Sequence, residues 1–137
     1  IDPQQSLRGG ARYLKNIIRS LPKSIKEPDR TWLALAAYNI GIAHLEDARV
    51  LTERSGGNPN LWQDVMERLP LLQKSSHYRN TRYGYARGAQ AAHYVQNVRY
   101  YQSILNWQDI SDNKPLPPLK IEDYLPEVLR GSSLSAL

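Results

Sequence analysis

The feature that most constrains the fold of this chain is an apolar stretch from Trp32 to Gly41, WLALAAYNIG. No polar residue lies between Trp32 and Ala37, so a helix formed here is apolar on every side and is expected to be buried. The stretch closes on Tyr38 and Asn39, which bring a hydroxyl and a carboxamide to the edge of a core. Such groups need hydrogen-bond partners, and a bound ligand is one candidate. The alternative is a plain helix stop, because Asn39 and Gly41 both tolerate the left-handed conformation.

The remainder of the chain also has helical periodicity, and no segment alternates as a strand does, so we predict an all-α fold of about five helices with short loops. The expected helices run from Asp2-Pro3 to about Ser20, from Pro28 through the apolar stretch, from Ile42 to a fading end at Ser55, from Leu61 to Leu69, and from about Tyr83 to Trp107. Residues 71–82 are expected to form a loop with room for one helical turn.

The length of 137 residues corresponds to one domain. We predict a helical part over residues 1–107 and a Pro-rich linker and tail over residues 108–137, because three prolines fall within four positions from Pro115 to Pro118. The chain starts Ile1-Asp2-Pro3 without an initiator Met, so we expect it to be an excerpt of a longer protein.

Composition excludes few classes of function. The chain has no Cys, so disulfides and cysteine metal ligands are absent, and no run approaches the roughly 18 apolar residues of a membrane span. The net charge of +5 favours anionic partners. Nucleic-acid binding is therefore an alternative, although no nucleic-acid-binding motif supports it, and it would predict steep salt dependence.

Two further features suggest a binding groove. Gly9 and Gly10 lie inside the first expected helix, where each costs about 1 kcal/mol relative to Ala, so a neighbouring helix or a ligand is expected to come close there. Six of the nine tyrosines fall between residues 78 and 101, while Phe is absent from the chain. Repeated Tyr in place of Phe implies hydroxyls at a wet boundary, as in a groove for a polar ligand with flat faces such as a sugar. Half-buried tyrosines on an ordinary helix are the plainer explanation.

The sequence offers no convincing catalytic group. The three histidines lack metal-ligand spacing and are expected at the surface, so no metal and no cofactor is predicted. Glu46 and Asp47 are expected on the polar face of the third helix. None of the carboxylates is framed by apolar residues in the way that raises the pKa of a catalytic acid. The residues themselves thus indicate a groove without a general acid.

Three motifs in order resemble the lysozyme-like lytic transglycosylases of glycoside hydrolase family 23. Ala36–Gly41 resembles their AYNxG motif, Asp2–Leu14 resembles the helix before it, and Tyr94–Val98 resembles the final tyrosine motif. The segments Leu69–Leu72 and Tyr83–Gly88 are most similar to the membrane-bound lytic murein transglycosylase F subgroup. The resemblance covers about residues 1–107.

The resemblance implies a goose-type-lysozyme-like helical domain that cleaves the bond between N-acetylmuramic acid and N-acetylglucosamine without water. One glutamate first protonates the glycosidic oxygen and then accepts the proton of the muramyl 6-hydroxyl, giving a 1,6-anhydro product. By position, Tyr38 and Asn39 line the cleft beside that glutamate and the muramyl N-acetyl group. Tyr94 reaches toward the glutamate and helps to hold it.

The chain departs from this pattern in one important respect. The family's glutamate precedes the AYN motif by several tens of residues, whereas only 31 residues precede Trp32 here, so the acid is expected upstream of Ile1. Gln90 also stands where many relatives carry an acidic residue. This fragment alone is therefore expected to be inactive. The alternative function is a non-catalytic helical module that binds glycan or regulates another protein.

The resemblance also implies partners and a location. The expected partners are peptidoglycan glycan strands and the upstream part of the same polypeptide, including a periplasmic solute-binding-like regulatory domain; nucleic acid is not among them. The expected location is the periplasmic side of the outer membrane, reached through the longer protein.

Overall fold

The computed structural model describes residues 2–108, and the fold of this part is all-α, as predicted. The expected linker and tail lie outside the described residues from Asp109 onward. The elements are α1 (Pro3–Ser20), α2 (Asp29–Ile40), α3 (Ile42–Arg54), α4 (Trp62–Arg68), a 3-10 helix η1 (Leu69–Gln73), α5 (Ser75–Tyr78) and α6 (Gly88–Gln108). No described helix is both long enough and apolar enough to span a membrane.

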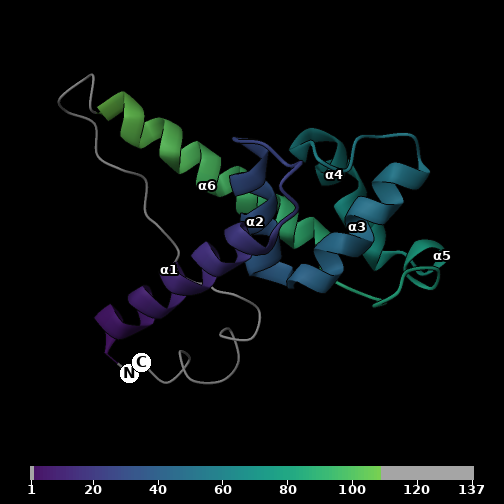
Figure 1. Cartoon of the computed structure of the whole chain (residues 1–137), viewed down its shortest axis with the longest axis horizontal. Helices are drawn as coiled ribbons and strands as arrows, with labels where there is room; N and C mark the ends of the chain where they lie inside the picture. The colour runs from purple at the N-terminus through teal and green to yellow at the C-terminus, as the bar shows by residue number, and fades with distance from the viewer. Residues whose placement is uncertain (1, 109–137) are drawn as a thin grey trace.

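Helix α2 is the centre of the fold, and α1, α3, α4 and α6 all pack against it (Figure 1). Residues 33–37 are buried with at most 7% of their surface exposed, which confirms the prediction of a helix buried on all sides. The small side chains Ala34, Ala36 and Ala37 allow neighbouring helices to approach on several faces. The core continues into α6 through Ala91 and Val95, both fully buried.

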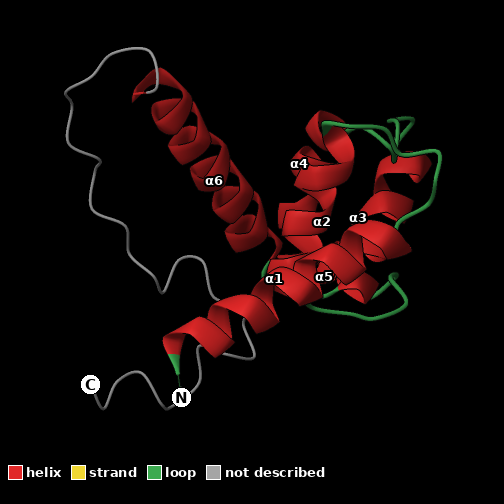
Figure 2. Cartoon of the chain, turned by 60° about the vertical axis from the view of Figure 1, so that its left-hand side comes forward, coloured by secondary structure: helices red, strands yellow, loops and turns green. Residues whose placement is uncertain are grey.

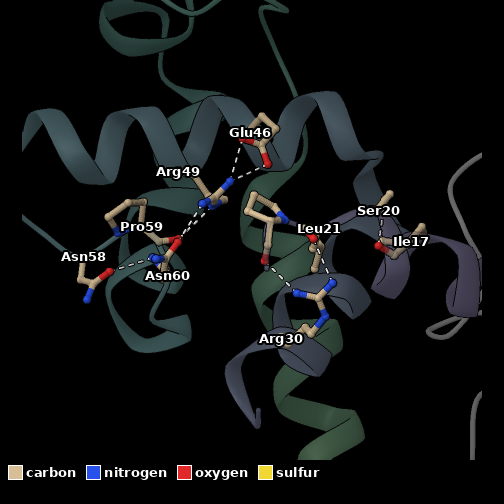
Figure 3. A network of polar contacts seen from close by, with 10 residues as sticks. Ile17, Ser20, Leu21, Arg30, Glu46, Arg49, Asn58, Pro59 and Asn60 are labelled. Atoms are coloured by element: carbon tan, nitrogen blue, oxygen red, sulfur yellow. Dashed lines mark hydrogen bonds and ion pairs between the residues drawn. The ribbon is translucent and has the colours of Figure 1, made fainter. Parts of the chain in front are cut away.

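The start of α1 follows the prediction. Asp2 is the N-cap, its Oδ1 accepts a hydrogen bond from the backbone N–H of Gln4 at 3.0 Å, and Pro3 occupies the first helical position. The end of α1 is fixed by Arg30 from α2. Its guanidinium donates to the backbone carbonyls of Ile18, Leu21, Pro22 and Ile25 at 2.6, 2.9, 2.8 and 3.3 Å. Figure 3 shows the contact with Leu21. One side chain thus satisfies the terminal carbonyls of α1 and the turn that follows it.

The connection between α3 and α4 is held in a similar way. Arg49 forms an ion pair with Glu46 at 2.8 Å and donates to the carbonyl of Pro59 and the side-chain oxygen of Asn60, both at 2.9 Å (Figure 3). Asp29, at the start of α2, accepts from the backbone N–H of Trp62 at 2.8 Å. These contacts fix α4 against the core.

The predicted start of the last helix is wrong, and the segment before it differs in part from the prediction. The last helix was expected from about Tyr83 but begins at Gly88, because the preceding residues are tied to α3 and Gly88 packs directly on the backbone of Leu69, where a Cβ atom would clash. The fourth helix ends at Arg68, within one residue of the predicted Leu69. The chain continues from Arg68 as the 3-10 helix η1 and then α5, so residues 71–82 are more ordered than the sequence indicated.

Helices α1 and α6 diverge from the core. Figure 2 shows the N-terminal half of α1 and the C-terminal half of α6 extending away from the other helices. Leu7 on α1 is 76% exposed, although it belongs to the apolar face that buries Ile17 further along the same helix. Tyr100 and Leu105 on α6 are also exposed. The apolar face of α1 is thus covered only over its second half.

Candidate functional site

The side chain of Tyr38 lies where α1 comes closest to the last turn of α2. A Cβ atom built on Gly10 would lie 2.8 Å from the Tyr38 hydroxyl oxygen, so only glycine leaves room for this approach. The predicted close approach at the glycine pair is confirmed for Gly10, and the neighbour is a side chain of another helix. Gly9 faces open space.

Tyr38 is the middle member of a row of three tyrosines from three helices. Its ring centroid lies 5.5 Å from that of Tyr13 on α1 and 6.5 Å from that of Tyr94 on α6, with the Tyr94 ring nearly parallel. Tyr13 is 46% exposed and Tyr94 is buried, so the row runs from the surface into the core. The structure thereby brings together two of the three predicted site residues.

Tyr13 is a member of this site that sequence reasoning did not single out. It lies one helical turn after Gly10, on the same face of α1. The spacing of three residues was the available signal. Gly10 marks the face of α1 that another helix approaches, and Tyr13 lies on that face one turn later, so it contacts the same Tyr38 side chain.

The electrostatic environment keeps Tyr38 protonated. Burial, and then the neighbouring Tyr13 hydroxyl, raise the pKa of Tyr38 above its ordinary value of 10.0. At neutral pH the residue is therefore a neutral O–H group that can both donate and accept a hydrogen bond.

Asn39 is the third predicted site residue, and its side chain is 3% exposed. Its Nδ2 atom is buried and has no hydrogen-bond partner among the described residues. A buried donor without a partner costs about 1–3 kcal/mol, so a group outside the described part of the chain is expected to satisfy it.

The helix-stop alternative is correct for Gly41 but not for Asn39. Gly41 has a φ of +93°, and its N–H donates to the carbonyl of Ala37 at 2.7 Å, which ends α2. Asn39 stays inside the helix, so its side chain is not needed for the stop. The carboxamide is thus available for another role.

The carboxylates show one correction. Asp47 was expected on the polar face of the third helix, but it is 4% exposed and accepts from the backbone N–H groups of Arg82 and Tyr83 at 3.2 and 2.9 Å. Both of its oxygens are used to fix a loop, so it acts as an anchor. Glu46, in contrast, is partly exposed and pairs with Arg49.

The histidines differ in exposure. His93 is exposed as expected, whereas His44 is only partly exposed and its Nδ1 atom is buried without a partner in the described part of the chain. Within residues 2–108 no three His, Asp or Glu side chains gather in the way that holds a metal ion.

Comparison with known proteins places this geometry in context. Residues 1–60 match the family model described as "Transglycosylase SLT domain". The chain is 58% identical over 108 residues, 79% of its length, to "Membrane-bound lytic murein transglycosylase F" of Alteromonas mediterranea. It is 56% identical over 114 residues, 83% of its length, to the protein of the same name from Saccharophagus degradans. It is 50% identical over its full 137 residues to that from a Shewanella species.

The chain spans only a part of these relatives. It covers 23% of the length of the Alteromonas and Saccharophagus proteins and 29% of the Shewanella protein. The similarity therefore extends over about a quarter of a longer protein and includes Tyr38 and Asn39 within the family match.

Proposed function

On the premise that residues 1–60 belong to the Transglycosylase SLT domain family, we propose that this chain is part of a peptidoglycan lytic transglycosylase. The reaction is the non-hydrolytic cleavage of the bond between N-acetylmuramic acid and N-acetylglucosamine, which leaves a 1,6-anhydromuramoyl end. The three relatives described above carry the name of such an enzyme, and identity of 50–58% over 108 or more residues supports the extension to this chain.

The observation that carries the proposal is that two consecutive residues near the end of α2 supply a neutral hydroxyl, on Tyr38, and a buried amide without a partner, on Asn39. An amide N–H donor with no partner suits the carbonyl oxygen of an N-acetyl group, and sugar rings stack on the flat faces of tyrosines such as the exposed Tyr13. We assign Tyr38 and Asn39 to the muramyl N-acetyl side of the cleft. Tyr94, which stacks on Tyr38, is assigned to hold the catalytic glutamate.

The chemistry then requires one acid that this chain does not supply. An upstream glutamic acid gives its proton to the glycosidic oxygen as the bond to C1 breaks. The 6-hydroxyl of the same muramyl residue attacks C1, and its proton returns to the glutamate, so the group ends as it began. This differs from the two-carboxylate scheme of hydrolytic glycosidases because no water takes part.

The exposed first half of α1 supports an upstream segment that packs there. Leu7 is 76% exposed on an otherwise apolar face, and α1 and α6 diverge where such a segment would insert (Figure 2). We propose that the upstream part of the domain covers this face and brings its glutamate beside Tyr38 and Tyr94. The remaining partners would be glycan strands and a solute-binding-like regulatory domain of the longer protein.

The cellular location that we propose for this chain rests on the same relatives. These relatives are named as membrane-bound enzymes, and we propose that this chain works at the cell envelope, on the periplasmic side of the outer membrane.

The alternative is a non-catalytic module that binds glycan. It is favoured by the carboxylates of the described residues, because Asp47 is engaged in fixing a loop and Glu46 in an ion pair. In that case Tyr38 and Asn39 would bind a strand without cleaving it.

Digestion of purified murein sacculi distinguishes the two functions. We would treat sacculi with this 137-residue chain and with the longer protein, and read the masses of the released muropeptides. Anhydro-muropeptides from the longer protein alone are expected. Anhydro products from the fragment would place the acid within this chain, and no product from either would favour the binding module.

A further inference from the structure

A second surface with functional character is formed by residues 78–87, which we call the tyrosine–arginine loop. It joins α5 to α6, and its exposed residues are Arg79, Asn80, Arg82, Tyr83, Tyr85 and Arg87. Tyr83 and Tyr85 are 48% and 53% exposed, so this loop presents two large aromatic side chains as well as guanidinium groups to solvent. Its tyrosines are among those from which the sequence suggested a groove for a polar ligand, and Tyr83–Gly88 is one of the segments that carry the family resemblance.

The charge around this loop is one-sided. Between Glu67 and Asp109 the chain has six basic residues and no acidic one. Glu46 pairs with Arg49 and Glu67 pairs with Arg68, and neither ion pair involves Arg79 or Arg82. The side chains of Arg79 and Arg82 are therefore not neutralised by an ion pair in the described part of the chain.

One carboxylate, that of Asp47, contacts the loop, but it binds the main chain and not the arginine side chains. Asp47 accepts from the backbone N–H groups of Arg82 and Tyr83, so its buried carboxylate fixes the main chain and leaves the guanidinium of Arg82 outside. Thr81 Oγ1 accepts from the N–H of Gly84 at 3.2 Å, and the φ of +76° at Gly84 turns the chain between the two exposed tyrosines. The loop is thus held in shape before any ligand arrives.

Contacts with aromatic rings orient the exposed side chains of Tyr85 and Arg82. Tyr78 meets the ring of Tyr85 edge to face, with centroids 5.7 Å apart. The guanidinium of Arg82 lies 5.4 Å from the ring centre of Tyr83. A guanidinium stacked on a ring keeps its N–H edge free for two parallel hydrogen bonds to a carboxylate.

The loop is also close to the site described above along the chain. It leads directly into α6, whose first residue is Gly88, and Tyr94 follows six residues later. At 1.5 Å per residue this corresponds to roughly 9 Å along the helix axis. The loop is therefore joined directly to the helix that carries Tyr94, without an intervening element.

We propose that the tyrosine–arginine loop binds the carboxylates of the peptide stems that project from a peptidoglycan strand, with Arg79 and Arg82 as the binding residues. This inference rests on the proposed function, and it adds a contact outside the sugar-binding cleft. Peptide stems carry free carboxylates at regular intervals along the strand, and exposed guanidinium groups beside aromatic rings suit such groups.

The test compares two probes on the 137-residue chain by isothermal titration calorimetry. One probe is a short glycan strand with peptide stems, and the other is the same strand after enzymatic removal of the stems. We expect the wild-type chain to bind the stem-bearing strand at least fivefold more tightly. Combined Arg79→Gln and Arg82→Gln substitutions should remove that difference and leave binding of the stem-free strand unchanged.

The matched control replaces two exposed basic residues away from the loop, Arg19→Gln with Lys23→Gln, and should keep the preference for stems. Equal affinity of the wild-type chain for both probes would overturn the proposal, as would a preference that survives in the loop variant. A different outcome is that the wild-type chain binds vesicles rich in phosphatidylglycerol and the loop variant loses only that binding. The loop would then bind lipid phosphates, and the proposal would also be wrong. Failure of the proposed function looks different, because the longer protein would then release no anhydro product whatever residues the loop carries.

Discussion

The hydroxyl oxygen of Tyr38 lies 2.8 Å from the position that a Cβ atom of residue 10 would occupy, so Gly10 and Tyr38 fix the distance between α1 and the last turn of α2. The neighbouring Gly9 has open space at the same position and provides an internal control. This single contact links the first helix, which the upstream segment is proposed to cover, with the residue that is proposed to meet the sugar.

Gly10→Ala should impair turnover by the longer protein without unfolding it. Alanine is worth about 1 kcal/mol more than glycine in a helix, and Gly9→Ala should show that gain as a higher free energy of unfolding. At position 10 the new methyl group displaces the Tyr38 hydroxyl, so we expect no net gain in stability and a drop in turnover of roughly tenfold, which corresponds to about 1.4 kcal/mol.

Urea unfolding and release of anhydro-muropeptides measure the two effects. Equal turnover in the Gly9→Ala and Gly10→Ala proteins would show that the position of the Tyr38 hydroxyl does not matter for the reaction.

Asn39→Ala should lower turnover more than stability. The Nδ2 atom has no partner among the described residues, so its removal takes away a desolvated donor and leaves no new unpaired group there. We expect the free energy of unfolding to change by less than about 1 kcal/mol, while turnover falls by roughly 10- to 100-fold as a hydrogen bond to the substrate is lost. A protein that unfolds instead would show that the buried Asn39 side chain serves the fold and not the substrate.

Tyr38→Phe should change the dependence of stability on alkaline pH. The pKa of Tyr38 is raised above 10.0 in the folded state, chiefly by burial, so the folded protein holds this proton more tightly than the unfolded chain. The corresponding stability is fully present below pH 10 and is lost as the pH rises through the folded-state pKa. Free energies of unfolding between pH 8 and pH 11 should therefore fall less steeply in Tyr38→Phe, and parallel curves would contradict the burial of this hydroxyl.

Local sequence signals were enough for the start of α1 and for the buried central helix. Asp2 and Pro3 marked the start of α1, and the uninterrupted apolar run marked α2, because each signal acts through residues within one or two helical turns. Tyr38, Asn39 and Tyr94 were named from the AYN and tyrosine motifs, and the structure stacks Tyr38 on Tyr94.

What the sequence could not show depends on contacts between distant segments. The polar-face pattern of α3 placed Asp47 in solvent, whereas its carboxylate is buried by a loop 35 residues further on. The same contact explains the late start of α6, since residues tied to Asp47 are not free to join a helix. The row of Tyr13, Tyr38 and Tyr94 likewise requires knowledge of how three helices cross.

Asp47→Asn should destabilise the fold by about 1–3 kcal/mol, the usual cost of weakening hydrogen bonds to a buried charged acceptor. The carboxamide keeps one oxygen acceptor but presents an NH₂ group to a backbone N–H, so one of the bonds to Arg82 and Tyr83 is replaced by two facing donors. Hydrogen exchange of these two amides should accelerate. Glu53→Gln, an exposed change of the same kind on the same helix, should leave both measurements unaltered.

Arg30→Lys should destabilise the protein although it conserves the charge. The guanidinium of Arg30 donates to four backbone carbonyls around the end of α1, and its planar fork reaches them together. An ammonium group has three donors on a single nitrogen and cannot span the same four oxygens, so at least one carbonyl loses its partner at a cost of about 1–3 kcal/mol. Urea unfolding measures this cost, and Arg19→Lys on the exposed side of α1 is the control. If the two variants were equally stable, water would satisfy these carbonyls as well as Arg30 does, and the end of α1 would be held by the burial of Leu21 and Ile25 alone.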